Sequence, residues 1–322
     1  MIGLLTLLAI AATLVIAVGT AAIMGSLARP PRLTPGRAMA MGLPSEPDEV
    51  GLTGESIELE LPDGVTVPAF VVEGSKPDGP TILMYHGLLE SRYASLPRAV
   101  VLADFASKLV LPDLRAHGEA SRSLCHGGTL EIEDVLATLE QVDGEGPLVL
   151  HGFSLGAGVV LGTAAKMCAS DKTPRAEAAV ARWQLVGVIA LGMYRRWYPP
   201  LYRLLWHYRI PPVPFVPLLR WIQEPLRPEL RHFDRAEDAK RIDVPLLMVH
   251  GEDDWLCEPR HARAVADAAP NAEFLTIPGA KHMDVATRDP DRYRAAIARF
   301  FEKRPEADAA STPQPAATES PA

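Results

Sequence analysis

The sequence contains few cysteines, and they follow no pattern. Its 322 residues include three cysteines, Cys125, Cys168 and Cys257, with no Cys-x-x-Cys pair among them. They are too few and too scattered for a disulfide framework or a cysteine-based zinc site. We expect them to be small, buried apolar side chains. No cluster of His, Asp and Glu has metal-ligand spacing either, so we expect neither a metal nor a cofactor.

The chain also lacks an excess of positive charge. Its net charge is −8 and its isoelectric point is near 5.6, which argues against a general nucleic-acid-binding protein. No internal repeat is visible. The length suits one large α/β domain with additional segments.

Residues 1–28 lack any charged side chain and consist mainly of Leu, Ile, Val and Ala. Because about 20 apolar residues can cross a bilayer as a helix, we predict a transmembrane anchor. A cleaved signal peptide is the alternative, since Ala and Gly are frequent near the end of this stretch. Arg29, Arg32 and Arg37 follow directly, and the positive-inside rule then places the rest of the chain in the cytoplasm. The unpaired cysteines agree with a reducing compartment.

The rest of the chain divides by composition. Residues 29–54 are rich in Pro and Gly without periodicity and are predicted to be a linker. Residues 55–192 and 239–303 alternate apolar strand patterns with helical patterns, which is typical of a mostly parallel sheet with helices on both faces. Residues 304–322 consist largely of Pro, Ala, Ser, Thr and Glu, and we expect them to be disordered. The expected strands are 56–61, 65–72, 81–85, 109–111, 147–153, 185–191, 245–250 and 272–277, and the expected helices are 94–106, 130–142, 155–168, 258–268 and 290–302.

Residues 193–238, the cap segment, interrupt this alternation. They are rich in aromatic side chains and proline, and residues 193–235 hold eight arginines against three acidic residues, a balance of 8 − 3 = +5. We predict a helical cap inserted over the sheet. Two interpretations stay open: an apolar roof for an acyl or aromatic substrate that also touches anionic lipid, or an insert whose aromatics form its own core. Under the first, the candidate substrate-binding residues are Trp197, Tyr198, Tyr202 and Trp206.

A glycine-flanked serine, Gly152-x-Ser154-x-Gly156, lies where the expected strand 147–153 meets the expected helix 155–168. A sharp strand-to-helix turn of this kind pushes the serine side chain into the open above the sheet edge. The neighbours two residues away must be small because the helix folds back onto the strand. The free N–H groups at the start of the helix favour negative charge near Ser154, which makes the N–H of Leu155 a candidate oxyanion donor.

A serine nucleophile needs a base, and the base needs an acid to orient it. The sequence offers Ser154, Asp254 and His282 in that order. Asp254 follows the expected strand 245–250, and His282 follows the expected strand 272–277. All three therefore fall at the carboxyl edge of a parallel sheet.

Four motifs in this order resemble the α/β-hydrolase superfamily over about residues 55–303. They are His86-Gly87, the segment 111–118 (Leu-Pro-Asp-Leu-Arg-Ala-His-Gly), Gly152-Phe-Ser-Leu-Gly156, and Gly251-Glu-Asp-Asp254 followed by Gly279-Ala-Lys-His282. Within the superfamily the chain is similar to membrane-anchored Bem46-like hydrolases and prolyl-oligopeptidase-like serine esterases. The resemblance implies an α/β-hydrolase fold with Ser154 as nucleophile, His282 as base and Asp254 as acid. It also implies oxyanion N–H donors at Leu88 and Leu155. The sequence departs from the pattern at Gly118-Glu-Ala-Ser121, which concerns the shape of that loop.

Several residues are alternatives for these roles. Asp253 adjoins Asp254, but the spacing after Gly251 favours Asp254. Asp284 is expected to be a surface residue. The histidines at 86, 151 and 250 are expected to be structural, to line the cleft or, for His86, to shape the oxyanion loop. His126-Gly127-Gly128 resembles a lipase oxyanion run but follows the wrong strand, and Cys125 beside it lacks the turn that a nucleophile requires.

These observations predict a serine hydrolase that cleaves carboxylic esters through an acyl-enzyme, on an apolar acyl substrate at a membrane. The expected partners are a small-molecule or lipid ester and the membrane, and no nucleic acid. The same triad could serve a thioesterase, an amidase, a peptidase or an acyltransferase. Outside enzymes, the alternative is a catalytically silent protein that binds an apolar ligand under the cap.

Overall fold

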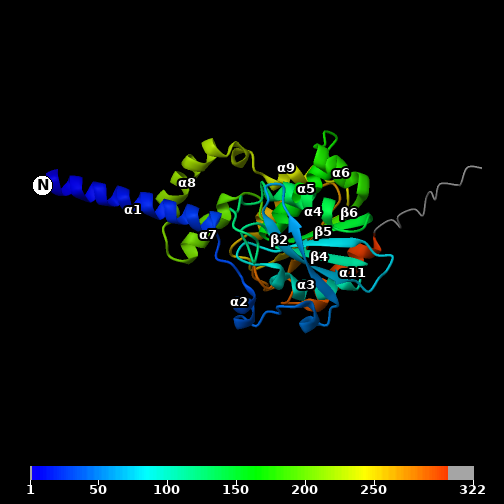
Figure 1. Ribbon diagram of the computed structural model, residues 1–322. Helices are drawn as coiled ribbons and strands as arrows, with labels where there is room; N and C mark the ends of the chain where they lie inside the picture. Colours follow the sequence, from blue (N-terminus) through cyan, green and yellow to red (C-terminus); the bar gives the residue numbers. More distant parts are fainter. Residues whose placement is uncertain (1, 304–322) are drawn as a thin grey trace, which may run out of the picture.

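The fold is built around an eight-stranded sheet (Figure 1). The computed structural model describes residues 2–303 of the 322-residue chain, so the disorder expected for residues 304–322 lies outside the described residues. The strand order is β1-β2-β4-β3-β5-β6-β7-β8. The pairs β1–β2 and β2–β4 are antiparallel and all the other pairs are parallel, which confirms the predicted mostly parallel sheet. The strands are β1 (Gly54–Glu60), β2 (Thr66–Glu73), β3 (Thr81–Tyr85), β4 (Lys108–Pro112), β5 (Gly146–Phe153), β6 (Trp183–Leu191), β7 (Leu246–Gly251) and β8 (Ala272–Ile277).

Helices cover both faces of this sheet, as predicted. The central strands are largely apolar, and β3 and β7 are buried at every residue, so each face requires a cover. One core cluster joins the sheet to α4 (Glu131–Gln141), α5 (Leu155–Cys168), α6 (Pro174–Arg182), α9 (Arg235–Ala239) and α10 (Pro259–Ala266). The second cluster joins the other face to α3 (Arg92–Ala103) and α11 (Pro290–Glu302). The helix α6 was not among the helices expected from the sequence.

The segment 29–54, which we expected to be a linker, packs against the domain. It contains the helix α2 (Pro35–Ala40) and the 3₁₀ turn η1 (Pro47–Val50). Leu33 and Ala38 are buried in the second core cluster. The guanidinium of Arg32 donates to the carbonyl oxygens of Ala120 and Ser121. The segment therefore holds the preceding helix close to the domain that contains the sheet.

The N-terminal helix α1 (Ile2–Ala28) projects from the domain, and its last turns lie between α7 and α8 (Figure 1). Within residues 2–303, this is the one helix whose length and composition would allow it to cross a membrane. The cap segment contains α7 (Tyr198–His207), α8 (Pro212–Leu226) and the 3₁₀ turn η2 (Pro228–Arg231) and ends with α9. Its helices share a small apolar cluster with the end of α1. The aromatic side chain of Tyr198 lies in this cluster, so the cap has a core of its own.

Candidate active site

Ser154 occupies a strained turn between β5 and α5. Its φ of 51° is in the left-handed region, which non-glycine residues rarely adopt. A Cβ on Gly152 would lie 2.3 Å from the carbonyl oxygen of Gly156, and a Cβ on Gly156 would lie 2.4 Å from that of Tyr85. Only glycine fits at both positions, because backbone from three segments meets there. The tight packing forces the chain to turn at Ser154 and leaves its side chain at the edge of the sheet.

The three residues suggested by chain order lie in one hydrogen-bonded series. The Oγ of Ser154 is 2.9 Å from the Nε2 of His282, and the Nδ1 of His282 is 2.8 Å from the Oδ2 of Asp254. The histidine and the aspartate are buried, on loops that follow β8 and β7. Both distances are within the reach required of a nucleophile, a base and an orienting acid. The arrangement can move a proton from Ser154 to His282 while Asp254 holds the imidazole.

Asp254 sits among hydrogen-bond donors. Its Oδ1 accepts from the N–H groups of Leu256 (3.0 Å) and Cys257 (2.8 Å). Burial opposes ionisation, but hydrogen bonds from His250 and His282 outweigh it and lower the pKa of Asp254 from 3.8 to about 2. The carboxylate is therefore charged at neutral pH.

Two neighbours of Asp254, namely Asp253 and His250, differ in their exposure to solvent. Asp253 is exposed, so it does not share the position of Asp254. His250 is fully buried, and its Nε2 lies 2.6 Å from the carbonyl oxygen of Cys257 and 3.2 Å from the Oδ2 of Asp254. This direct contact was not evident in the sequence, which favoured a structural or cleft-lining role for His250 over a direct one. The geometry makes it a residue that positions Asp254.

The backbone N–H of Leu155 is free beside Ser154. The N–H of Ser154 donates to the carbonyl oxygen of Leu191 (2.8 Å), and that of Gly156 donates to the carbonyl oxygen of His86 (3.1 Å). Within residues 2–303, the N–H of Leu155 donates no hydrogen bond, and Leu155 lines the pocket described below. A free N–H at a helix start next to the serine is suited to bind an oxyanion.

The oxyanion loop, residues 86–90, offers a second free N–H. Gly87 donates its N–H to the carboxylate of Glu90 (2.8 Å), and the same oxygen accepts from Arg98 (3.0 Å). Leu89 has a φ of 67°, which reverses the chain there. Across the described chain, the N–H of Leu88 has no acceptor, and Leu88 lines the pocket. The buried Glu90–Arg98 ion pair thus binds one amide of the loop and leaves the next one free.

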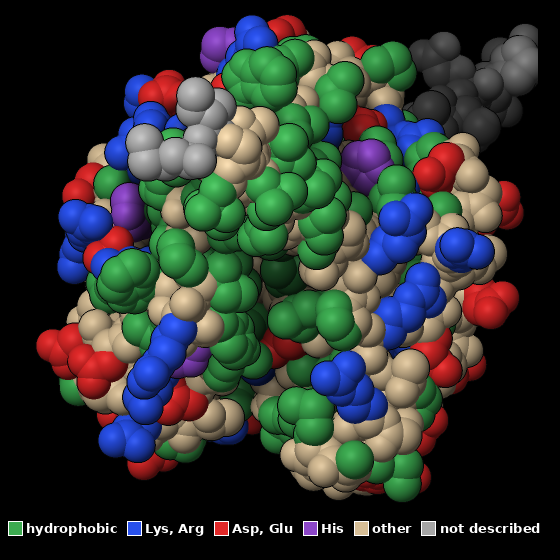
Figure 2. All heavy atoms as spheres, turned by 90° about the vertical axis from the view of Figure 1, so that its left-hand side faces the viewer, with side chains coloured by type: hydrophobic (Ala, Val, Ile, Leu, Met, Phe, Trp, Pro, Cys, Tyr) green, Lys and Arg blue, Asp and Glu red, His purple; other side chains and the backbone are tan. Residues whose placement is uncertain are grey.

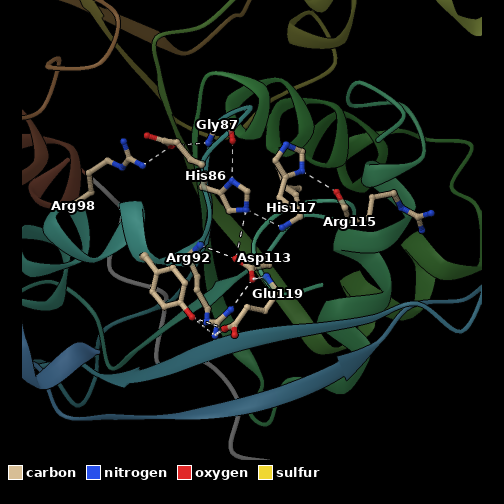
Figure 3. Close-up of polar contacts among 11 residues, drawn as sticks. His86, Gly87, Arg92, Arg98, Asp113, Arg115, His117 and Glu119 are labelled. Carbon is tan, nitrogen blue, oxygen red and sulfur yellow. Dashed lines mark hydrogen bonds and ion pairs between the residues drawn. The ribbon is translucent and has the colours of Figure 1, made fainter. Parts of the chain in front are cut away.

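His86 holds this loop from below (Figure 3). Its Nε2 accepts from the N–H of Leu114 (2.9 Å), so the ring hydrogen is on Nδ1, which donates to the carbonyl oxygen of Gly87 (2.8 Å). Burial lowers the pKa of His86 to about 4. A nearby ion pair between Arg92 and Asp113 anchors the adjacent segment. His86 is therefore a neutral histidine that links residues 86–90 to the segment that contains Leu114.

Three buried histidines predict how stability depends on pH. Burial lowers the pKa of His86 and His117 to about 4 and that of His151 to about 3. Between about pH 6.5 and 4 the unfolded chain binds protons that the folded chain does not, so stability falls as the pH decreases. Asp134, whose pKa burial raises to about 6, opposes this with one proton over part of the window. We expect the thermal midpoint of the full-length protein to be lower at pH 5 than at pH 7.

The two ring nitrogens of His151 have no partner among the described residues, which supplies a matched test. Replacing His151 with leucine removes one titrating group without breaking a hydrogen bond. The change in the free energy of unfolding between pH 7 and pH 5 should then shrink by up to about 1.4 kcal/mol per pH unit. A thermal midpoint of the wild-type protein that is higher at pH 5 than at pH 7 would contradict the assignment of buried neutral histidines.

A largely apolar pocket of about 170 Å³ opens above Ser154 and His282. Its walls come from the oxyanion loop, the start of α5, the start of α7, the loop after Asp254 and the end of α1. The reacting groups are at one end, and the remaining lining is mostly aliphatic and aromatic. Such a site suits an apolar group attached to a reactive polar one.

Only one of the four predicted substrate-binding residues of the cap lines this pocket, namely Trp197. Tyr198 packs in the cap cluster, and Tyr202 and Trp206 line an open groove on the outer side of α7. The pocket wall is instead completed by Pro200, Leu201, Leu204 and Tyr194. Helical spacing explains this placement, because Trp197, Leu201 and Leu204 follow at i, i+4 and i+7 whereas Tyr202 and Trp206 share the opposite face.

The remaining alternatives have other roles. Burial raises the pKa of the Cys125 thiol, which makes it a poor nucleophile. The N–H groups of His126 and Gly128 donate to Glu131 (2.6 and 2.9 Å), so they are not free to bind an oxyanion. The carbonyl oxygen of Gly127 accepts from the indole N–H of Trp197 at 2.5 Å. This loop therefore supports the cap.

Comparison with known proteins identifies the family to which most of the domain is similar. The model of the alpha/beta hydrolase family matches residues 82–296, which include every residue of the hydrogen-bonded series. The human protein ABHD12B is 30% identical over 204 residues, which cover 62% of this chain and 53% of that protein. The putative non-heme bromoperoxidase BpoC of Mycobacterium tuberculosis is 35% identical over 68 residues, 21% of this chain and 26% of that protein. The chain thus spans about half, or less, of the curated relatives that it matches.

Solved structures with a similar fold have lower sequence identity. The esterase Pf2001 of Pyrococcus furiosus has a TM-score of 0.64 at 16% identity and is covered over 98% of its length by 86% of this chain. A bacterial membrane phospholipase A has a TM-score of 0.57 at 18% identity, with 94% of this chain and 97% of that chain covered. These similarities show a shared fold. Together with the family match over residues 82–296, they lead to one conclusion: the chain belongs to the alpha/beta hydrolase family.

Proposed function

We propose that the protein is a serine hydrolase that cleaves carboxylic esters with an apolar acyl part. The observation that supports this most directly is the series Ser154–His282–Asp254 at the reacting end of an apolar pocket. Serine, histidine and ionised aspartate in this order are the groups that acyl transfer through an acyl-enzyme requires. The complete series gives no support to a catalytically silent ligand-binding protein.

In the proposed reaction, the Oγ of Ser154 attacks the ester carbonyl while the Nε2 of His282 takes its proton. The N–H groups of Leu88 and Leu155 bind the oxyanion of the tetrahedral intermediate. Its collapse breaks the bond to the alcohol, which leaves with the proton from His282. Water, deprotonated by His282, then attacks the acyl-enzyme and releases the carboxylic acid and free Ser154. Asp254 holds the Nδ1–H of His282 throughout and stabilises the imidazolium.

The helix α1 supports a location at a membrane. It is apolar and largely exposed over its first two-thirds, and Arg29, Arg32 and Arg37 follow it. We infer that α1 is retained as an anchor, because its last turns pack into the cap cluster. Removal as a signal peptide would expose this cluster to water. We infer that the domain lies on the cytoplasmic side, because the arginines follow α1. Residues 193–238 then act as the cap of the pocket.

Turnover of p-nitrophenyl esters from acetate to palmitate tests the proposed reaction. Each methylene buried in the pocket stabilises the bound ester by about 0.8 kcal/mol, so kcat/KM should rise by up to about fourfold per methylene until the pocket is full. The measurement uses the full-length protein in detergent or vesicles, with a fluorophosphonate probe to titrate reactive serine. Labelling without turnover of any ester would shift the assignment to an amide, thioester or acyl-transfer substrate. Absence of both would contradict a serine hydrolase.

A further inference from the structure

The end of α1 is part of the pocket wall. Leu27 lines the pocket that contains Ser154 and His282, although it is more than a hundred residues away from either in sequence. The side chains of Ile23, Met24 and Leu27 pack on the cap cluster, which includes Leu201 of α7. A helix that served only as a membrane anchor would not contribute a side chain to a catalytic pocket.

Contacts at Gly19 and at Ala28 set the position of the last turns of α1. A Cβ on Gly19 would lie 2.5 Å from the Cε1 of Phe215, so α8 approaches the backbone of α1 closely there. The carbonyl oxygen of Ala28 accepts from the N–H of Cys125 (2.8 Å), and Arg32 binds two carbonyl oxygens of the same neighbourhood. The last turns of α1 are therefore held against the domain, and the direction of the helix determines which face meets a membrane.

The side of the molecule from which α1 projects is apolar and hollowed (Figure 2). Hydrophobic side chains gather around the hollow, with Lys and Arg toward the margins of this face. On α8, Trp221 is 75% exposed and Leu226 is 76% exposed, and on α7, Trp206 is 72% exposed. The pocket rim itself carries Met283, which is 64% exposed. So much exposed apolar surface on the cap helices and the pocket rim is unusual for a protein surface in water.

The charge pattern along α1 indicates how deep the cap helices would lie relative to a bilayer. The helix carries no charge before Arg29, and the cap helices pack on the segment from Gly19 to Leu27, on the uncharged side of that arginine. Exposed tryptophans together with arginines are the composition found at the boundary between lipid tails and headgroups. The cap segment also carries the excess of arginine noted above, which suits anionic headgroups.

We propose that a lipid bilayer covers this face, so that α7 and α8 lie in its interfacial layer and the pocket opens beside Leu27 into the lipid. A lipid ester then enters along α1 with its acyl chain still in the apolar phase. The entry route rests on the proposed function, whereas the docking of the cap does not. The two parts are therefore tested by separate measurements.

Quenching of tryptophan fluorescence by brominated lipid tests the docking. The full-length protein is reconstituted in vesicles of phosphatidylcholine and phosphatidylglycerol, with and without phosphatidylcholine dibrominated in its acyl chains. Of the five tryptophans, Trp206 and Trp221 are the two that should contact lipid on the cap face. We expect the double variant Trp206→Phe/Trp221→Phe to lose at least half of the quenchable intensity. Quenching equal to that of the wild type would place the cap in water and overturn the proposal, whatever the protein catalyses.

A pair of substitutions in α1 tests the entry route. Leu27→Trp fills the pocket mouth, whereas Leu14→Trp places the same side chain at an exposed position of the same helix. We expect Leu27→Trp to lower turnover of p-nitrophenyl palmitate in vesicles about tenfold relative to the rate of fluorophosphonate labelling, and Leu14→Trp to leave this ratio unchanged. An unchanged ratio in Leu27→Trp, or an equal fall in both variants, would overturn entry along α1. A wild-type protein that shows neither labelling nor turnover would instead refute the proposed function, and the quenching result would still decide the docking.

Discussion

Replacement of Ser154 with alanine is expected to lower kcat on p-nitrophenyl esters by a factor on the order of 10⁶. The hydroxyl is the one group at the end of the pocket that lies within hydrogen-bond distance of His282 Nε2 among the described residues. Without it no acyl-enzyme can form. The residual rate would come from the free N–H groups and from binding alone. Ester turnover and fluorophosphonate labelling of the same preparations measure the two consequences.

Ser170→Ala is the matched control, because this serine is exposed in the loop after α5, the helix that Ser154 begins. We expect this variant to keep wild-type turnover and labelling. The thermal midpoint of Ser154→Ala should remain close to that of the wild type, since the change removes one oxygen and leaves the glycine-lined turn intact. Turnover that survives in Ser154→Ala would refute the serine mechanism.

Replacement of Asp254 with asparagine should lower kcat about 10⁴-fold. The carboxylate accepts a hydrogen bond from the Nδ1 of His282 at 2.8 Å, which leaves Nε2 free to take the serine proton. An amide at this position can donate to Nδ1 and stabilise the wrong tautomer. It would also lose the charge that stabilises the imidazolium. The steady-state rate across the pH range is the measurement, since the wrong tautomer lowers kcat at every pH where Asp254 would be ionised.

Asp253→Asn supplies the control at the next residue. Asp253 is exposed and Asp254 is buried, so the same chemical change one position earlier should alter kcat by less than about twofold. Fluorophosphonate labelling should slow in Asp254→Asn, because the activated serine depends on His282. Equal losses in the two variants, or a larger loss in Asp253→Asn, would show that the acid has been assigned to the wrong residue.

The strands and the elbow were predictable because their physical requirements are local. The sequence patterns over 81–85 and 272–277 indicate strands without knowledge of their neighbours, and the structure has β3 and β8 at these residues. Gly152 and Gly156 reveal the turn because no other residue tolerates backbone at 2.3 to 2.4 Å. The positions of Ser154, Asp254 and His282 after parallel strands were sufficient to predict that the three lie close together, since loops after parallel strands meet at one edge of the sheet.

The lining of the pocket was not predictable from residue type. Aromatic content favoured Tyr198, Tyr202 and Trp206, but the rotation of α7 turns these side chains into the cap cluster or outward. The packing of residues 29–54 was hidden for a similar reason. Proline and glycine indicate the absence of long regular elements, and they do not indicate whether the segment is bound to a surface, as Leu33 and Arg32 are.

The sequence by itself determined the family, the apolar helix and the residues that can carry the chemistry, because each depends on short motifs or on composition. Tertiary structure alone decided that Leu27 lies in the pocket, that His250 contacts Asp254 and that the N–H groups of Leu88 and Leu155 remain free. These facts arise where segments distant in sequence meet. Their contacts depend on the direction of a helix or the rotation of a side chain, which periodicity and residue type do not specify.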